Sequence, residues 1–439
     1  MASVLRRRAP LLAAALALVA AVVALVLVLA LRGGGGGHAV ARGEPLAYVP
    51  AAGADVVFDV DTREPLLGLA VEELAPRLTN GAVSDDQVHP LLGGRAVVAI
   101  DGGKAWLAFA TDAEAPRAGN GAAAAKRDGV VVIAPSKADL DASLQGARQP
   151  AARYARAAFD KRFAGLPAGG TARVAFDPRA LLQQRAPQIA STRWARSLRD
   201  GAAVLTTSGT ELRVPFRITA DPVGLTPADL PIATGAAPPQ ARGDAPLTIG
   251  VRDPAHTLAF AWTAGLLGGL SVIKDLPGIV RPNVDDLGPN GTITTASPRD
   301  RGHLTLRTEP PDPGDWSRKL SFLDSVTDIA RGLGAVDVDV TKRDGGYDIE
   351  QGGKLAGRVG VYGRALVLSN DPKADLRAAA AAPAAPTPKG AAGALTARLR
   401  SSALATQIPA LVRDRLGDIT AWARAELNGV TGELRLALR

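Results

Sequence analysis

Ser271 and Lys274 are spaced as in the S-x-x-K motif, in which a lysine activates a serine for attack on an acyl group. The S-D-N and K-T-G motifs that accompany it in acyl-transferring enzymes do not occur in the sequence. A four-residue pattern with two free positions also arises often by chance. An envelope hydrolase that uses Ser271 and Lys274 is therefore the alternative function rather than the leading one.

Three aspartates, Asp55, Asp59 and Asp61, fall on one face of a strand that is predicted over 54–60. Clustered carboxylates can bind calcium or act as a general acid and base. The three residues are candidates for a metal site or for the aspartate pair of a hydrolase. No glycine-punctuated calcium loop surrounds them, so we expect them to line the solvated side of a sheet.

The sequence contains no further pattern that points to a reaction or a cofactor. Its four histidines lack partners at metal-binding spacing, and P-loop, G-x-S-x-G and G-x-G-x-x-G motifs are absent. The chain has no cysteine, which excludes thiolate metal sites, a cysteine nucleophile and disulfides. No cofactor is therefore predicted.

The elements that would position these residues are short strands and helices. Strands are predicted from alternating or continuous apolar residues, and helices from apolar residues that recur every three or four positions. Asp-Gly-Gly at 101–103 and Ser-Gly at 208–209 favour hairpin turns. The predicted strands are 54–60, 95–100, 104–110, 129–134, 171–176, 202–207, 210–219 and a β-rich tract at 336–369, and the predicted helices are 64–78, 151–163, 191–198 and one around Trp316.

The segment 232–246 is rich in Pro, Gly and Ala and predicts a linker between two modules, 46–231 and 247–439. Short sequence matches in the same order relate these modules, which we interpret as a tandem duplication. The matched residues are Asp61 with Asp253, Lys137–Leu140 with Lys373–Leu376, Ala180-Leu181 with Ala403-Leu404, and Glu211 with Glu433.

Residues 258–273 are apolar all round and contain several glycines. The stretch is short for a membrane span, and glycine weakens an isolated helix. We therefore predict a helix that is buried between the modules, with a lipid-contacting or ligand-tunnel helix as the alternative. The residues that would line an apolar ligand site or inter-module surface are Leu258, Phe260, Trp262, Leu266 and Leu270.

The composition, 47% apolar and 21% charged, is typical of a globular chain. The formal charge of +8 comes from basic residues that are interspersed with acidic ones, without a block of like charges. Only 4% of the residues are aromatic, so side chains that could stack on bases are scarce. Nucleic acid is therefore not an expected partner.

Residues 10–32 predict a transmembrane anchor, because residues 10–31 are apolar and uncharged, and a helix of this length reaches roughly 30 Å, the thickness of a bilayer core. Arginines at 6–8 predict that residues 1–9 stay in the cytoplasm and that the chain beyond a Gly-rich tether at 33–45 is extracytoplasmic. A signal peptide cleaved near 39–41 is the other interpretation.

The chain resembles a family of bacterial membrane-anchored proteins catalogued as a domain of unknown function, number thirty-three fifty-two. The resemblance lies in the arginine-flanked anchor, in LAYVPAAGADVVFDVDT before a helix, and in strand-DP-helix units such as VAFDPRALL and VRDPAHTL. It covers most of 45–439 and implies no reaction, ligand or catalytic residue. The degenerate unit LTARLRSSAL lacks Asp-Pro and departs from the pattern.

These observations predict an α+β protein with an N-terminal transmembrane helix and two related halves, each a mainly antiparallel sheet with packed helices. The leading functional hypothesis is a single-pass cell-envelope protein that acts as a binding or scaffolding module. Its expected partners are the membrane, through the N-terminal helix, and an apolar ligand or another envelope protein.

Overall fold

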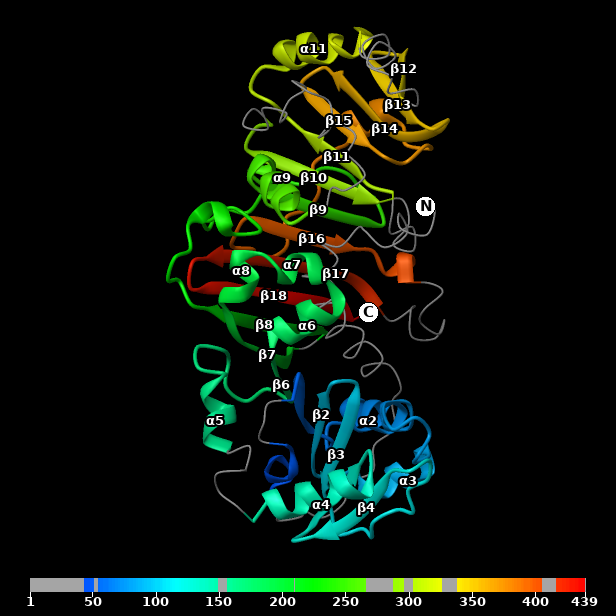
Figure 1. The fold of residues 1–439 in the computed structure, drawn as a ribbon, viewed down its shortest axis with the longest axis vertical. Coiled ribbons are helices and arrows are strands. Elements are labelled where there is room, and N and C mark those ends of the chain that lie inside the picture. Colours follow the sequence, from blue (N-terminus) through cyan, green and yellow to red (C-terminus); the bar gives the residue numbers. More distant parts are fainter. Residues whose placement is uncertain are drawn as a thin grey trace.

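The dominant feature of the computed structural model is one antiparallel sheet of 18 strands. The structure describes residues 43–50, 54–148, 156–208, 210–265, 287–295, 303–325, 338–404 and 416–438. Within them the sheet extends along the long axis of the molecule, as Figure 1 shows.

The strands of the sheet are short in the outer parts and longer near its centre. The first eight are β1 (Val56–Asp61), β2 (Arg95–Asp101), β3 (Lys104–Ala110), β4 (Ala123–Arg127), β5 (Val130–Ala134), β6 (Ala172–Phe176), β7 (Leu198–Ser208) and β8 (Glu211–Ala220). The others are β9 (Leu247–Arg252), β10 (Asn290–Thr295), β11 (Thr305–Thr308), β12 (Val338–Arg343), β13 (Gly346–Gln351), β14 (Lys354–Tyr362), β15 (Ala365–Ser369), β16 (Leu395–Leu399), β17 (Leu416–Glu426) and β18 (Gly429–Leu438).

Every pairing in the sheet is antiparallel, and together the pairings form a single row of strands. From one edge to the other the order is β4-β5-β3-β2-β1-β6-β7-β8-β18-β17-β16-β9-β10-β11-β15-β14-β13-β12. Strands β4 and β12 therefore lie at opposite ends of the molecule (Figure 1).

The predicted fold class, two halves that each have their own sheet and packed helices, is wrong. The last strand of the chain, β18, pairs with β8 along nine residue pairs, and this pairing makes one sheet of both halves. The sequence could not show this, because an edge strand and a central strand have the same alternation of apolar residues.

The strand order is the same in both directions from the β8–β18 pair. One direction runs β8-β7-β6-β1-β2-β3-β5-β4, and the other runs β18-β17-β16-β9-β10-β11-β15-β14. Strands β7 and β17 have eleven residues each, and their registers shift at the same place, between Leu198 and Gly201 and between Leu416 and Ile419. No hairpin in the described residues of the first half corresponds to β12–β13.

The shared order also determines which residues of the central strands correspond. Glu211 is the first residue of β8, and Gly429 is the first residue of β18. Pro215 and Glu433 then occupy the same position in their strands and lie directly opposite each other in the ladder. The predicted match of Glu211 with Glu433 therefore differs from the structural correspondence by four residues.

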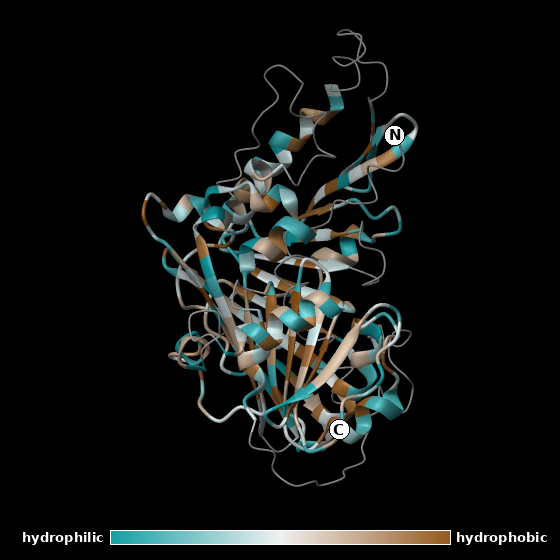
Figure 2. Cartoon of the chain, turned by 60° about the horizontal axis from the view of Figure 1, so that its bottom comes forward, coloured by the Kyte–Doolittle hydropathy of each residue, from teal (hydrophilic) through white to brown (hydrophobic). Residues whose placement is uncertain are grey.

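In the first half both faces of the sheet are buried. Val60 belongs to one apolar cluster with Leu107 and Val174, whereas Val57 belongs to a second cluster, on the other face, with Val132. Figure 2 accordingly shows long hydrophobic stretches along the strands. A strand buried on both faces needs apolar residues at nearly every position, which explains the runs in β3 and β5.

The helices are few and short, and most begin at a proline or a capping side chain. Asp177 accepts hydrogen bonds from the N–H groups of Arg179 and Ala180, and Ser136 accepts one from Asp139. The helices are α2 (Pro65–Leu78), α3 (Asp85–Val88), α4 (Lys137–Gly146), α5 (Arg156–Lys161), α6 (Pro178–Arg185), α7 (Pro187–Ala190), α8 (Arg193–Ser197), α9 (Pro254–Thr263), α11 (Pro313–Ser321) and α13 (Leu376–Ala380), with 3-10 turns η2 (Pro45–Tyr48), η3 (His89–Leu91), η5 (Pro227–Asp229) and η7 (Ser401–Leu404).

The predicted hairpin over 95–100 and 104–110 is confirmed as β2 and β3, and the predicted helix over 64–78 is confirmed as α2. The predicted anchor, 10–32, lies outside the described residues. No helix in the described part of the chain combines the length and the apolar character that a membrane crossing requires.

Candidate functional site

The most concentrated polar cluster on the sheet surrounds Asp59 in β1. Its side chain lies on the same face as Val57, under η2 and α5, and the residue is only 2% exposed. Arg173 of β6 is its direct partner in the ladder, and Arg95 of β2 lies on its other side. The alternation of β1 thus places a carboxylate on a buried face instead of the solvated side that the sequence predicts.

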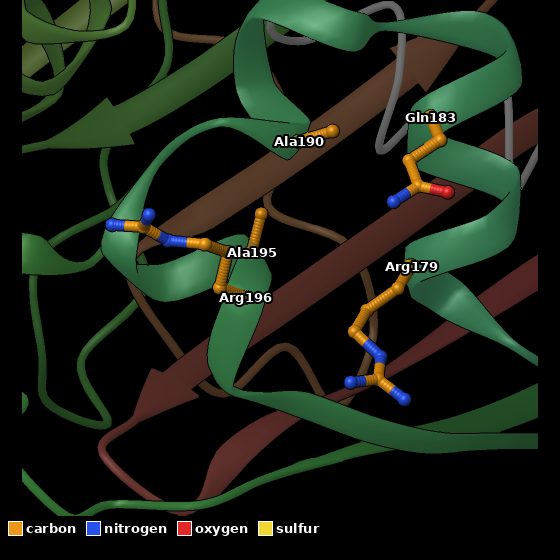
Figure 3. A pocket seen from close by; sticks show the side chains of 5 residues that line it. All are labelled: Arg179, Gln183, Ala190, Ala195 and Arg196. Carbon is orange, nitrogen blue, oxygen red and sulfur yellow. The ribbon is translucent and has the colours of Figure 1, made fainter.

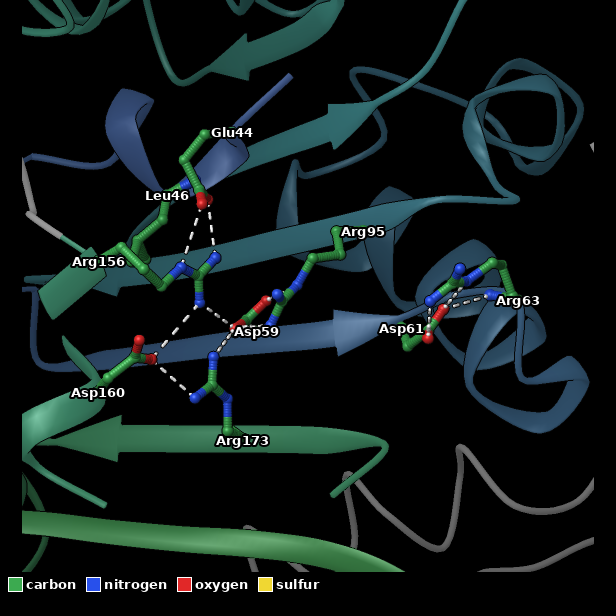
Figure 4. A network of polar contacts seen from close by, with 9 residues as sticks. All are labelled: Glu44, Leu46, Asp59, Asp61, Arg63, Arg95, Arg156, Asp160 and Arg173. Atoms are coloured by element: carbon green, nitrogen blue, oxygen red, sulfur yellow. Dashed lines mark hydrogen bonds and ion pairs between the residues drawn. The ribbon is translucent and has the colours of Figure 1, made fainter. Parts of the chain in front are cut away.

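Three guanidinium groups hold the Asp59 carboxylate (Figure 4). Arg95 donates from Nε to Oδ1 at 3.0 Å and from Nη2 to Oδ2 at 2.5 Å. Arg156 donates from Nη1 to Oδ2 at 2.6 Å, and Arg173 donates from Nη2 to Oδ2 at 2.8 Å. Both oxygens are therefore occupied by charged donors.

Two further carboxylates balance the arginines. Glu44 accepts hydrogen bonds from Nε and Nη2 of Arg156 at 3.1 and 2.7 Å, and Asp160 accepts one from Nη1 of Arg173 at 2.7 Å (Figure 4). The guanidinium of Arg173 also stacks on the ring of Phe159, 5.2 Å from its centroid. The three arginines thus face three carboxylates in one network, which joins η2, α5, β1, β2 and β6.

The network shifts the pKa values of two of its members, Asp59 and Arg156. Burial alone would raise the pKa of Asp59, but the charges of Arg156 and Arg95 and the hydrogen bonds from Arg156 and Arg173 outweigh it and lower that pKa. For Arg156, burial opposes the charged form, while the bonds to Glu44 and Asp59 raise its pKa. Asp59 and Arg156 therefore stay charged at neutral pH, and Asp59 is a poor general base.

The other two candidate aspartates have separate partners. Asp55 accepts from the Gly102 N–H at 3.0 Å and from Nε2 of Gln184 at 2.7 Å. Asp61 binds Arg63 at the surface, with Nη2 to Oδ2 at 2.5 Å. Across the described residues, no group of three or more His, Asp or Glu is placed to hold a metal ion. Asp59 and Asp61 lie in β1 and Asp55 directly precedes it, but the three aspartates do not form one site.

The candidate apolar surface is only partly described. Phe260 of α9 is 4% exposed and packs edge-to-face on Trp194 of α8, with ring centroids 6.3 Å apart, so it is a core residue. Leu258 packs against a cluster that contains Trp316. Leu266, Leu270, Ser271, Lys274 and the side chain of Trp262 lie outside the described residues.

A second charged cluster lies on the β8–β18 pair. Glu433 accepts from Nε and Nη2 of Arg213 at 3.0 and 2.8 Å, and also from Nε of Arg435. Burial acts to raise the pKa of Glu433, but the two arginines outweigh it and lower that pKa. Arg213 and Glu433 are 220 residues apart in sequence, so this contact joins the two halves.

A small hollow lies between α6, α7 and α8 (Figure 3). Its lining residues are Arg179, Gln183, Ala190, Ala195 and Arg196. The guanidinium groups of Arg179 and Arg196 point in different directions in Figure 3, so they do not converge on one ligand position.

Sequence reasoning missed Arg95, Arg156, Arg173 and Glu433. Nothing in their local sequence distinguishes them from the many other charged residues of the chain. The one available signal was indirect: an aspartate in the middle of an apolar strand needs a partner if both faces are buried.

Comparisons with known proteins find no matching family model and no curated protein that matches in sequence. Solved structures of a protein designated TP0453, in crystal forms III and I, are each 13% identical to the chain and have TM-scores of 0.28 and 0.27. They cover 42% of this chain and 83% and 81% of theirs. A similarity of this size supports no inference about fold or function.

Proposed function

We propose that the chain is a membrane-tethered scaffold of the bacterial cell envelope, belonging to the family that it resembles. The observation that carries this proposal is the single sheet, because it makes one body of two halves and separates its two edges, β4 and β12, by the length of the molecule. A continuous hydrogen-bonded sheet of this kind suits a scaffold whose two ends have to be held far apart.

The attachment of the N-terminal segment supports the same proposal. Residues 43–50 include the end of the predicted tether, 33–45, and Leu46 and Tyr48 of η2 are 0% and 5% exposed. Glu44 joins this segment to Arg156, and Arg156 joins it to Asp59 in the sheet. A pull on the anchor would therefore pass into the sheet through a buried ionic network as well as through the backbone.

The orientation is tested with reporter fusions after Arg439. Alkaline phosphatase is active only outside the cytoplasm, so we expect an active phosphatase fusion and a dark fusion to a fluorescent protein that matures only in the cytoplasm. The opposite pattern would overturn the extracytoplasmic placement. Removal of residues 1–32 should release the protein from the membrane fraction, whereas its retention there would contradict the anchor.

The scaffold role is tested by cutting the mechanical connection without removing the anchor. We expect that Glu44→Gln together with Arg156→Gln frees the segment 43–50, which protease digestion of membrane-bound protein would detect as faster cleavage near residue 50. Unchanged cleavage would show that the ionic network does not secure the segment. Ligand binding near residues 258–273 stays a prediction.

A further inference from the structure

The outer edge of β4 is one of two described sheet edges, with that of β12, at which strand-pairing groups are left free. β4 pairs with β5 on one side, and no described strand pairs with it on the other. The two-residue turn Asp128-Gly129, with φ of 48° and 72°, closes the β4–β5 hairpin at Arg127 and Val130. Because hydrogen-bonded and non-bonded pairs alternate along an antiparallel ladder, Ala124 and Lys126 direct their N–H and C=O groups outward.

The corresponding edge in the second half already receives a strand. β14 and β15 form the equivalent hairpin, with a two-residue turn between Tyr362 and Ala365, and β13 pairs with the outer edge of β14. Val359 of β14, which has the position of Ala124, faces Tyr347 of β13. The geometry of this edge therefore accepts an antiparallel strand.

The charged side chains of β4 do not block the edge. Nζ of Lys126 bonds to the carbonyl oxygen of Asp112 and lies 3.5 Å from Oε1 of Glu114. Both partners belong to the loop between β3 and β4. Arg127 is drawn to Asp128, with Nε 3.7 Å from Oδ2. Lysine on an edge strand usually discourages pairing, but here it is turned toward its own chain.

We propose that β4 pairs with β4 of a second copy of this chain, in antiparallel register about a two-fold axis at Ala125. In this register Ala124 faces the partner's Lys126, and Ala123 faces the partner's Arg127. Each long basic side chain then lies opposite an alanine. No two basic side chains face each other directly, which would destabilise an antiparallel pair. The arrangement repeats the way in which β8 and β18 meet in the middle of the molecule.

A two-fold contact of this kind closes on itself, because the only free groups of β4 are used up by the partner copy. The contact is small, since each strand offers only two outward residues. Attachment to a membrane favours it, because anchored copies share two dimensions and a high effective concentration. The β4–β4 pair would join two copies of the chain end to end.

The register gives a sharp test in the full chain, which contains no cysteine of its own. Ala125 and its copy would be a non-hydrogen-bonded pair with Cα atoms about 4.5 Å apart, inside the range for a disulfide. In membranes treated with an oxidant, Ala125→Cys should give a disulfide-linked dimer on a non-reducing gel. The matched control is Ala123→Cys, whose copies would lie about 13 Å apart and should yield about tenfold less dimer.

A second variant tests the edge itself. Ala124→Pro removes an outward N–H group that β5 does not use, so the fold should be kept while dimer formation is lost. In the same oxidised membranes, Ala125→Cys should lose its disulfide-linked dimer when Ala124→Pro is added, while the circular dichroism of the two purified chains stays equal. No disulfide-linked dimer from Ala125→Cys in membranes, equal cross-linking of the two cysteine variants, or a dimer that survives Ala124→Pro in a folded protein would each overturn the proposal.

Discussion

Asp59 and Arg173 face each other directly in the ladder between β1 and β6, and their side chains meet with Nη2 2.8 Å from Oδ2. Two more arginines reach the same carboxylate from β2 and α5. One buried negative charge therefore holds three positive ones, and its removal would leave the arginines to repel one another.

The first prediction concerns the stability of the body. Asp59→Asn in a chain that begins at residue 43 should lower the free energy of unfolding by about 3 kcal/mol, the low end for breaking a buried ion pair, because the arginines are partly exposed. Urea denaturation measures this. The matched control is Asp61→Asn, whose exposed pair with Arg63 should account for at most about 1 kcal/mol. Equal losses for both variants would contradict the importance of the network.

The second prediction concerns acid. The folded-state pKa of Asp59 is lowered below its ordinary value of 3.8, so the stabilisation is complete above the unfolded-state pKa and is lost as the pH falls through the lower, folded-state value. Urea midpoints should therefore be steady from pH 7 to about 5 and fall below about 4. The difference between wild type and Asp59→Asn should shrink in the same range. A difference that persists at low pH would assign the effect to packing instead.

The third prediction concerns the joint between the halves. Glu433→Gln should lower the free energy of unfolding by about 2 kcal/mol, because Glu433 is 7% exposed and accepts hydrogen bonds from both Arg213 and Arg435. Calorimetry should also show a broader transition if the halves begin to unfold separately. Glu426→Gln is the control, since that ion pair with Arg424 is exposed. A sharp transition with unchanged midpoint would refute the coupling role.

The fourth prediction concerns close packing on the same strand. A Cβ atom at Gly432 would lie 2.3 Å from the backbone oxygen of Trp422 and 2.5 Å from the ring of Phe216. Gly432→Ala should therefore cost about 1–3 kcal/mol of stability, since the β17 backbone has to move. At Gly119 the nearest atom would be 3.9 Å away, so Gly119→Ala should change stability by less than about 0.5 kcal/mol. Thermal melts of both variants decide the point.

Local patterns in the sequence predict several elements of this fold, but not their arrangement. The turn at 101–103 and the apolar residues beside it predict β2 and β3, and periodic leucines predict α2. The sequence does not predict β4, because its residues AAAKR favour a helix over a strand. Only the pairing with β5 makes this segment extended. Where each strand lies in the row depends on contacts between distant segments, which no local pattern records.

The candidate site shows the same division. Alternation places Asp59 and Asp61 on one face of β1, but it cannot show that η2 and α5 cover that face. Arg156 lies 97 residues from Asp59, so their contact arises only in the folded chain. A buried aspartate in an apolar strand could at most suggest that cationic partners exist.

The pairing of β18 with β8 has a consequence for the order in which the chain matures. During synthesis β8 emerges long before β18, and until the final strand arrives its edge stays open to any extended segment nearby. A chain that stops before Gly429 would keep that edge uncovered permanently. Loss of only the last eleven residues should therefore turn a folded product into one that aggregates or is degraded, although it removes a small fraction of the mass.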